Sequence, residues 1–399
     1  MLKRLTIYLS LLAGFAFVIY SCAKDETNID TLEEQETNSQ LSELIDGQYI
    51  VVFNEGAIDL GRADISAANY WEVRAQVSEA AQAILLENRI VDRELLQTYA
   101  KVYQGIAINL DQVELARLKA DSRVNYIEQD QTVHVTMGGP PGGGGGGAQS
   151  TPWGVTRVGG PVAGATAGTA WIIDSGVDLD HPDLNVNTAL SATFLGGNTT
   201  PDDQNGHGTH VAGTVAAINN DIGVVGVAAG APVVAVRVLD RRGSGAYSGV
   251  IGGVDYVAGV ASSGDAANMS LGGGASPALD AAVVAASGSC PFALAAGNES
   301  TNAGNSSPAR ANGPNIYTVS SMATGDNWSS FSNYGNPPVD FCAPGSSIPS
   351  TYKDGGYATL SGTSMASPHV CGILLMGNVS SSGTVNGDPD GNPDPIAHL

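Results

Sequence analysis

Three segments each place a side chain capable of chemistry where an apolar element begins or ends. Asp174 closes the apolar run 171–173, His207 opens a helical stretch after Gly206, and Ser364 opens another after a glycine and a threonine. A hydroxyl is a weak nucleophile unless a base accepts its proton, and imidazole is the side chain that most often does so. A carboxylate, an imidazole and a hydroxyl are therefore the components of nucleophilic catalysis.

Each of these residues also has a simpler interpretation. Asp174 alone would cap a turn, and Ser364 alone would cap a helix. His207 and His210 form an H-x-x-H pair that suggests a metal, but no glutamate or third ligand of suitable spacing accompanies them. Asn298, which follows Ala-Ala-Gly, would alone be a turn residue. If the simpler interpretations were all correct, four unrelated residues would match the components of one catalytic site by coincidence. We therefore interpret the set as one site.

The segments around Asp174, His207 and Ser364, in this order, resemble the signatures of the subtilisin-like serine proteases, nearest to the proteinase K branch. The resemblance covers residues 48 to about 376. It implies that Ser364 is the nucleophile, that His207 is the general base and acid, and that Asp174 orients the imidazole. The Ser364 backbone N–H and the Asn298 side chain would stabilise the oxyanion.

The resemblance also assigns three segments to the substrate cleft. They are Gly243, Ser244 and Gly245 in the outer segment, Ser270, Leu271, Gly272 and Gly273 in one wall of the primary specificity pocket, and Ala295, Ala296 and Gly297 in the other wall. Glycine lets an extended peptide approach closely and pair as an added strand. Because such pairing reads backbone more than side chain, we expect broad specificity, with bulky apolar residues preferred before the scissile bond by resemblance.

Near-continuous apolar runs between residues 150 and 376 predict parallel strands that are covered on both faces. The expected strands are Thr169–Ile173, Pro232–Leu239, Ala267–Leu271, Phe292–Ala296, Ile316–Ser320 and Val339–Cys342. Helical stretches alternate with these strands and predict an α/β fold with a mostly parallel central sheet. The resemblance implies that this is a three-layer subtilisin-like domain. Ligand chemistry is expected at the carboxyl ends of the strands.

A smaller domain precedes this one and is separated from it by a run of six glycines, Gly142 to Gly147. Its elements are expected in the order β-α-β-α-β: strand Tyr49–Phe53, a helix within Ile65–Leu86, strand Val102–Leu110, a helix capped by Asp111, and strand Val124–Ile127. This order predicts a small α+β, ferredoxin-like domain. It resembles the family's inhibitory propeptide, which implies that residues 131–137 thread the cleft and that cleavage falls between about Val135 and Gln149.

The first residues have the form of an export signal. Lys3 and Arg4 precede an apolar run, residues 5–20, that is slightly short for a spanning helix. The sequence that ends at Cys22 resembles a bacterial lipoprotein cleavage box, which predicts lipidation of Cys22. An ordinary signal peptide with an incidental cysteine is the alternative. We therefore expect an exported protein, either an outer-surface lipoprotein or extracellular after processing.

The composition limits the partners. The chain has 399 residues and a formal net charge of −22, and no basic stripe offsets this charge, so nucleic acids are excluded. The expected partners are protein or peptide substrates and the chain's own propeptide; a membrane is reached only through the lipid anchor, and we expect a monomer. The chemistry requires no cofactor, but the resemblance implies a structural Ca²⁺ held by the carbonyls of Pro314 and Ile316 and by Asp340.

Cys290, Cys342 and Cys371 lie in apolar contexts, so buried free thiols are the expected state, and a Cys290–Cys342 disulfide is left as an alternative. Residues 388–394 resemble a calcium loop, but two prolines and the missing terminal glutamate predict a solvated tail instead. The family helix that begins near Ser364 normally runs longer, so the C-terminal packing layer is reduced.

These features divide the chain into six parts. They are a signal peptide at 1–21, a flexible tether at 22–46, an inhibitory propeptide domain at 47–136, a Gly-rich linker at 137–149, a subtilisin-like peptidase domain at 150–377 and a polar C-terminal tail at 378–399. The leading hypothesis is an autoprocessed serine endopeptidase that acts through an acyl-enzyme. The alternatives are a non-catalytic surface-binding lipoprotein and a peptidase whose only reaction is its own maturation.

Overall fold

The computed structural model describes residues 42–60, 64–135, 142–144, 147–162 and 168–399. The expected signal peptide, Cys22 and most of the tether lie outside these residues. In the described part, no helix is both long enough and apolar enough to cross a membrane. The propeptide domain and the peptidase domain belong to one structural unit.

The propeptide domain has the expected two helices and one strand more than expected. Its elements are β1 (Leu44–Phe53), α1 (Tyr70–Glu87), β2 (Leu95–Tyr99), β3 (Gly105–Asn109), α2 (Gln112–Lys119) and β4 (Val124–Val135). The strands pair antiparallel in the order β4-β1-β3-β2, which is the ferredoxin-like arrangement. The sequence analysis missed β2, and it placed Leu44 and the residues up to Asp46 in the tether although β1 already begins there.

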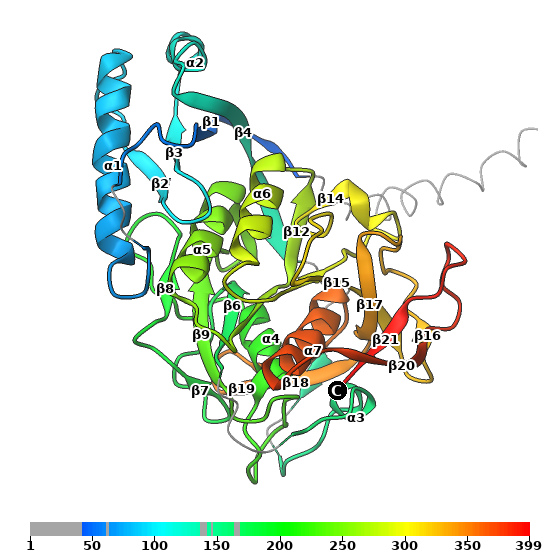
Figure 1. Ribbon diagram of the computed structural model, residues 1–399. Helices are drawn as coiled ribbons and strands as arrows, with labels where there is room; N and C mark the ends of the chain where they lie inside the picture. Colours follow the sequence, from blue (N-terminus) through cyan, green and yellow to red (C-terminus); the bar gives the residue numbers. More distant parts are fainter. Residues whose placement is uncertain (1–41, 61–63, 136–141, 145–146, 163–167) are drawn as a thin grey trace, which may run out of the picture. The chain divides into compact units, whose positions relative to one another are not determined.

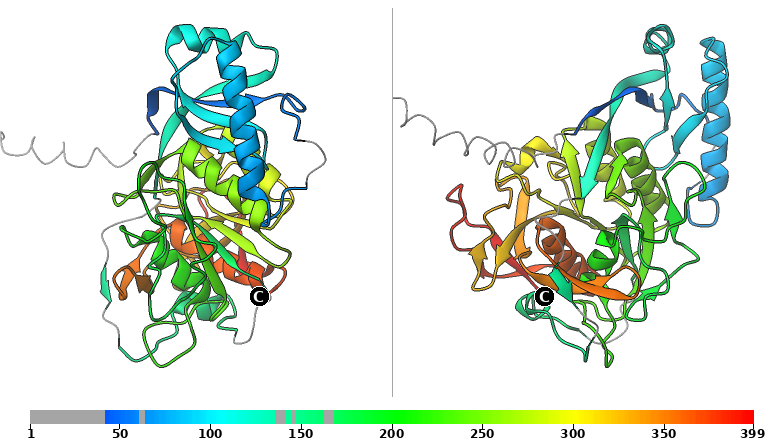
Figure 2. Two further views of the ribbon diagram at one scale, coloured as in Figure 1. Left: turned by 90° about the vertical axis from the view of Figure 1, so that its left-hand side faces the viewer. Right: turned by 180° about the vertical axis from the view of Figure 1, so that it is seen from behind.

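Alternation along β1 explains how the propeptide sheet is covered. Tyr49, Val51 and Phe53 pack under the propeptide's own helices, whereas Ile50 and Val52 belong to a core shared with the peptidase domain. Successive side chains of a strand point to opposite faces, so one face of the sheet is committed to the neighbouring domain. In Figures 1 and 2 this face lies over α5 (Tyr247–Val260) and α6 (Pro277–Ala286).

The peptidase domain is built on the expected mostly parallel sheet. Its strand order is β20-β21-β17-β15-β13-β11-β6-β9-β7, and β8 and β16 pair with β9 and β15 outside this path. The strands are β6 (Ala170–Asp174), β7 (Asn185–Val186), β8 (Ala192–Thr193), β9 (Pro232–Arg237), β11 (Ala266–Met269), β13 (Phe292–Ala295), β15 (Ile316–Ala323), β16 (Asn327–Trp328), β17 (Val339–Pro344), β20 (Ser380–Thr384) and β21 (Pro395–His398).

Helices cover both faces of this sheet, which confirms the three-layer architecture. Trp171 and Ile173 of β6 pack into the core beneath α5 and α6, while Ala170 and Ile172 pack beneath α4 (His207–Ala216) and α7 (Thr363–Met376). The remaining elements are α3 (Trp153–Arg157), the 3₁₀ turn η1 (Ala303–Asn305), β10 (Ser244–Ala246), β12 (Leu271–Gly274), β14 (Ser306–Ser307), β18 (Ile348–Tyr352) and β19 (Gly356–Leu360). Figure 1 shows α7 and α4 together on the side opposite α5.

The strand order reverses direction at β6. The chain leaves β6, returns as its neighbour β9, and then crosses to the other side as β11. Loops leave such a position in opposite directions and open a crevice at the carboxyl ends of the strands. Asp174 is the last residue of β6, so it lies where the fold offers a site.

The C-terminal residues form the predicted solvated segment only in part: residues 389–393 are exposed, but strands flank them. β21 pairs in parallel with β17 and extends the central sheet, and β20 folds back on β21. Asp394 and Ile396 are fully buried. Asn336 Nδ2 donates to Asp394 Oδ1 at 2.7 Å, and Ser320 Oγ donates to the other carboxylate oxygen. These strands supply a packing layer after the short α7.

The glycine run is also more ordered in part than expected. Gly142–Gly144 form β5, which pairs antiparallel with β19 through Tyr357, Ala358 and Thr359. Glycine backbone groups can pair like any others, so the absence of side chains did not prevent this contact.

We predict that Asp394→Ala destabilises the peptidase domain by about 1–3 kcal/mol. It removes the buried carboxylate that accepts from Asn336 and Ser320 and leaves these donors only their longer bonds to the Val339 and Phe341 carbonyls. Thermal unfolding in a Ser364→Ala background, where self-digestion is removed, measures the change. Asp390→Ala, at an exposed position of the same loop, is the matched control. Equal melting temperatures for the two variants would contradict this role of Asp394.

Candidate active site

Asp174 and His207 form a buried carboxylate–imidazole pair. His207 Nδ1 lies 2.8 Å from Asp174 Oδ1, and neither side chain is exposed. The Ser175 backbone N–H also donates to Asp174 Oδ1, at 2.7 Å. Two donors to one carboxylate oxygen fix the orientation of the carboxylate. The remaining carboxylate oxygen, Oδ2, and His207 Nε2 have no hydrogen-bond partner among the described residues.

Gly206 sets the start of the helix that carries His207. Its φ is 106°, a conformation that favours glycine, and a Cβ there would lie 2.3 Å from the Tyr352 ring. Asp203 Oδ1 accepts from the Gly206 backbone N–H at 2.9 Å, and Asp203 Oδ2 accepts from Thr209. The turn before α4 is thus held from both sides, and this places the imidazole over the end of β6.

Ser364 lies in the first turn of α7, at the position that the sequence predicted. In this structure its Oγ donates to the Ser270 carbonyl at 3.1 Å, and His207 Nε2 makes no hydrogen bond with it. Ser270 Oγ donates in turn to the Ser364 carbonyl at 2.8 Å. The two serines therefore bind each other reciprocally, and the structure assembles the Asp174–His207 half of the predicted triad without a serine–imidazole bond.

Asn298 presents a donor that nothing described accepts. Its Oδ1 accepts from the backbone N–H of Thr363 at 2.9 Å and from the Thr363 hydroxyl at 3.1 Å. Its Nδ2 is buried without an acceptor among the described residues. Because a buried unpaired donor costs free energy, such a group points to an oxygen supplied from outside. The sequence analysis assigned no role to Thr363, the residue that precedes Ser364.

The predicted substrate segments flank an extended strand of the propeptide. Ser244 and Gly245 of β10 pair antiparallel with His134 and Val133 of β4. The Gly243 carbonyl accepts from the Val135 backbone N–H at 3.0 Å.

On the other edge, Leu271 and Gly272 of β12 pair with Val135 and His134 of the same strand. β4 thus lies between β10 and β12 as a middle strand, in the manner of a bound peptide.

Gly273 also lies beside this strand, since a Cβ there would be 3.2 Å from the Thr132 carbonyl oxygen of β4. It pairs on its other side with Ser307 of β14. Ala295 and Ala296 are buried at the end of β13, and Gly297, with φ of 105°, leads the chain to Asn298. Among the described residues, Ala295, Ala296 and Gly297 make no hydrogen bond with β4.

The predicted calcium residues are found near the start of β15. Asp340 Oδ2 accepts from the Thr318 backbone N–H at 2.9 Å, and burial raises the pKa of this carboxyl group. Pro314 is exposed and Ile316 is buried. Within the described residues, no group of three or more acidic, histidine or cysteine side chains is arranged to hold a metal.

The other histidines and cysteines have structural surroundings. His210 Nε2 lies 2.9 Å from the Ile348 carbonyl, and burial lowers the pKa of this imidazole to about 3. The expected free thiols are present: Cys290, Cys342 and Cys371 are buried and unpaired by disulfides. Burial raises the pKa of the Cys290 thiol to about 12. None of these groups is placed for metal binding or for nucleophilic chemistry.

Three acidic side chains between the domains were not identified from the sequence. Glu128 accepts from Ser276 Oγ at 2.5 Å and from the Ala278 backbone N–H at 2.9 Å, at the start of α6. Asp130 accepts from the Ser248 backbone N–H at 3.1 Å, at the start of α5. Asp255 lies within α5 and is fully buried. A single aspartate in an otherwise apolar helix was the available signal for the last of these.

The chain matches two known families, one over each of its two described domains. The profile described as "Subtilase family" matches residues 171–376, and the profile described as "Peptidase inhibitor I9" matches residues 48–136. A solved cold-adapted subtilisin-like serine proteinase superposes with a TM-score of 0.55 and 41% sequence identity. The superposition covers 62% of this chain and 97% of that one.

Named relatives agree with these matches. Alkaline serine exoprotease A of Vibrio alginolyticus is 44% identical over 284 residues, which is 68% of this chain but only 51% of the relative, so the chain spans about half of that protein's length. Subtilisin NAT of Bacillus subtilis subsp. natto is 39% identical over 293 residues, covering 70% of this chain and 72% of the relative. With a family profile spanning more than half of its length and relatives of this similarity, the chain belongs to the Subtilase family of serine peptidases and carries a family I9 inhibitory segment ahead of its peptidase domain.

Proposed function

We propose that the chain is the precursor of an exported serine endopeptidase that hydrolyses peptide bonds with broad specificity. The observation that carries this proposal is the convergence of a buried carboxylate–imidazole pair, an unpaired amide donor and a bound extended strand on one end of the central sheet. The folded precursor is a zymogen, because its own strand β4 occupies the place of a substrate.

The proposed first step is attack by Ser364 Oγ on the scissile carbonyl. Rotation about the Cα–Cβ bond releases Oγ from the Ser270 carbonyl and turns it toward His207 Nε2, which has no competing partner. Catalytic hydrogen bonds are often absent before substrate binds and form in the complex. His207 accepts the hydroxyl proton, Oγ bonds to the carbonyl carbon, and the C=O electron pair moves to oxygen.

Asp174 supports this step through charge and orientation. Its hydrogen bond to Nδ1 selects the tautomer with a free Nε2 lone pair, and its negative charge stabilises the imidazolium that forms. His207 then gives the proton to the leaving amine, which departs as the acyl-enzyme forms. Water then attacks the acyl carbon with His207 as base. The proton passes from His207 to Ser364 Oγ as the acid product leaves, which restores the hydroxyl.

Asn298 is proposed to stabilise the oxyanion together with the backbone N–H of Ser364. The Oδ1 contacts with Thr363 prevent the amide from flipping, so Nδ2 is held as a fixed donor. A donor that is oriented before the reaction needs no reorganisation as negative charge develops on oxygen.

Backbone pairing supports broad specificity. Residues 132–135 are held by β10 and β12 mainly through main-chain groups, and such contacts are available to any extended peptide. We propose that maturation cleaves between about Val135 and Gln149, and that the peptidase resembles the proteinase K branch more than others of the family.

Export and calcium complete the proposal. A lipoprotein signal with lipid on Cys22 would hold the precursor at a membrane surface until cleavage separates the peptidase from its anchor, and the mature enzyme is proposed to act as a monomer.

We also propose a structural Ca²⁺ at Pro314, Ile316 and Asp340. Carboxylate and carbonyl oxygens are the hard ligands that this ion takes in proteins.

Ser364→Ala is expected to leave the precursor folded, uncleaved and unable to digest casein, because the hydroxyl is the nucleophile both for maturation and for turnover. Gel electrophoresis, intact mass and casein digestion of the purified wild type and variant measure this. A wild type that neither processes itself nor digests casein would contradict the proposal. Processing without casein digestion would restrict the reaction to self-maturation.

Asn298→Asp is expected to lower kcat about 10²–10³-fold with little change in KM, because it keeps the shape and the Oδ1 acceptor but removes the Nδ2 donor. Steady-state hydrolysis of a peptide anilide by the processed enzyme measures both constants. Asn298→Ala should show a comparable loss. A kcat that is unchanged in both variants would remove Asn298 from the oxyanion site.

A further inference from the structure

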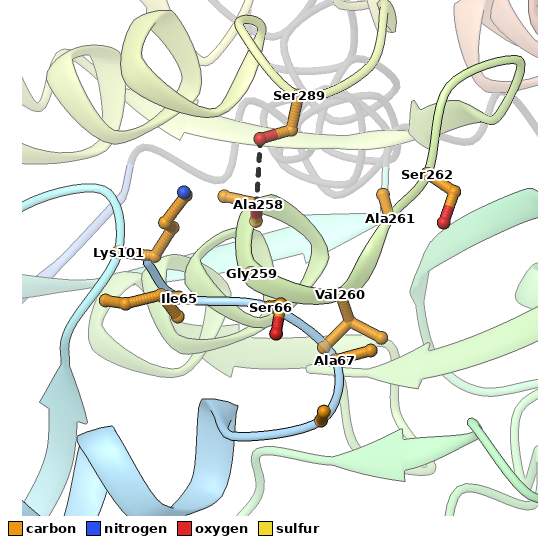
Figure 3. A pocket seen from close by; sticks show the side chains of 11 residues that line it. Ile65, Ser66, Ala67, Lys101, Ala258, Gly259, Val260, Ala261, Ser262 and Ser289 are labelled. Atoms are coloured by element: carbon orange, nitrogen blue, oxygen red, sulfur yellow. Dashed lines mark hydrogen bonds between the residues drawn. The ribbon is translucent and has the colours of Figure 1, made fainter. Parts of the chain in front are cut away.

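The pocket in Figure 3 holds no unpaired buried polar atom that would recognise a ligand. It is lined mainly by residues 65–68 and by residues 258–262 at the end of α5. Ser289 Oγ, which also lines it, already donates to the Ala258 carbonyl at 2.8 Å. The buried polar atoms without a partner among the described residues lie elsewhere, and Nδ2 of Asn298 is one of them. Unsatisfied polar chemistry is therefore found at the turn that carries Asn298 rather than in this pocket.

The turn around Asn298 contains two residues with positive φ. Gly297, just before Asn298, has a φ of 105°, and Ser300, just after it, has a φ of 54°. A side chain makes this region unfavourable, so Ser300 keeps its conformation only because surrounding contacts hold it. Thr363 binds the Asn298 side chain and accepts from the Gly297 backbone N–H at 3.1 Å. These contacts act on the first half of the turn, and the second half needs another support.

Asn333, which lies far along the chain, holds this turn on both sides of Asn298. It is fully buried. Its Oδ1 accepts from the backbone N–H groups of Glu299 and Thr301, both at 3.0 Å. Its Nδ2 donates to the Ala296 carbonyl at 3.0 Å. The residues that flank Asn298 are thus bound through their main-chain groups by a single amide.

The surroundings of Asn333 leave its amide only one orientation. Oδ1 accepts two hydrogen bonds, and Nδ2 donates a second one to Glu299 Oε2 at 2.6 Å. A flipped amide would place an NH₂ group against two N–H donors and an oxygen against two acceptors. The packing is equally close, because a Cβ at Gly297 would lie 2.2 Å from Asn333 Nδ2. The backbone N–H of Asn333 also donates to the Gly297 carbonyl at 3.0 Å.

The segment that carries Asn333 is itself tied to the central sheet. Ser332 Oγ accepts from the backbone N–H of Ser321 in β15 at 2.9 Å. The Phe331 carbonyl accepts from the Ser300 backbone N–H at 3.0 Å, which adds support at the residue with positive φ. The position of the turn therefore follows from the position of β15, and Asn333 is the side chain that connects the two.

We propose that Asn333 is a positioning residue for the oxyanion donor, and this rests on the proposed role of Asn298. Among the described residues, the side-chain hydrogen bonds of Asn333 all go to the turn. Asn333 fixes the backbone on both sides of Asn298, so that Nδ2 points to the place where negative charge develops. Substrate binding between β10 and β12 does not depend on this turn. Asn333 therefore acts on kcat and leaves KM nearly unchanged.

The test compares the processed forms of full-length variants in hydrolysis of a peptide anilide. Immobilised wild-type enzyme cleaves the propeptide of any variant that processes itself slowly and is then removed. Prolonged labelling of Ser364 by a fluorophosphonate counts the active molecules. We expect Asn333→Ala to lower kcat per active molecule about 10–10²-fold, because a small displacement of a fixed donor is enough for such a loss, with KM within about twofold of the wild type.

Asn336→Ala is the matched control. It removes an amide from the same segment, but this amide donates to the Val339 carbonyl at 3.1 Å and to Asp394 Oδ1 at 2.7 Å rather than to the turn. Any loss of stability should lower only the number of active molecules, so kcat per active molecule should equal that of the wild type.

A second background separates positioning from a general structural role. In Asn298→Ala, a further Asn333→Ala change should alter kcat by less than about twofold, because the donor that Asn333 positions is gone. If Asn333→Ala yields no folded peptidase, Asn333→Ser, which keeps one hydroxyl, should lower kcat in the wild-type background only.

An equal loss of kcat in both backgrounds, or an unchanged kcat when Asn333 is replaced beside an intact Asn298, would overturn the proposal. A wild type without turnover would instead overturn the proposed function. An Asn298→Ala variant with the kcat of the wild type would remove the oxyanion role of Asn298, and the role of Asn333 with it.

Discussion

The hydrogen bond between Asp174 and His207 is the constraint on which the remaining structure depends. Both groups are removed from water, so a misplaced or unpaired partner would leave a buried polar group at a cost of several kcal/mol. The pair forms only if β6 ends at residue 174 and α4 begins at residue 207 on the same side of the sheet. The strand reversal at β6 and the positive φ of Gly206 together meet this condition. The same sheet edge then receives α7 with Ser364 and the turn with Asn298.

The propeptide completes this arrangement and blocks it. One face of its sheet is apolar and is covered by α5 and α6, so it shares a core with the enzyme that it inhibits. Its last strand continues from that shared core into the cleft between β10 and β12. Folding and inhibition therefore use one continuous surface, with Glu128 and Asp130 meeting the positive ends of the two helices.

The central strands and the starts of the two catalytic helices could be predicted from the sequence, because each depends on residues that are close together in the chain. The apolar runs ending in polar residues predicted the ends of the central strands to within three residues. The Gly-His and Gly-Thr-Ser segments predicted where α4 and α7 begin. What the sequence did not disclose depends on partners far along the chain. β2 is short, and its Gln97 and Tyr99 donate hydrogen bonds across to the peptidase domain, at the Phe194 and Ser248 carbonyls. Asp394 lies in a polar segment that predicts exposure, and its burial depends on hydrogen bonds with Ser320 and Asn336, which are distant in the sequence. The rotamer of Ser364 depends on Ser270, and no local pattern reports it.

The central claim is that Ser364 becomes a nucleophile because His207, held by Asp174, can accept its proton. Labelling of the processed enzyme with a fluorophosphonate, followed by mass spectrometry of its peptides, tests this directly, since the reagent bonds to an activated serine oxygen and releases fluoride. The account predicts one adduct per molecule, on Ser364, which is lost in a His207→Ala peptidase whose propeptide has been removed by added wild-type enzyme. An adduct on a different serine, or equal labelling of Ser364 with and without the imidazole, would contradict it.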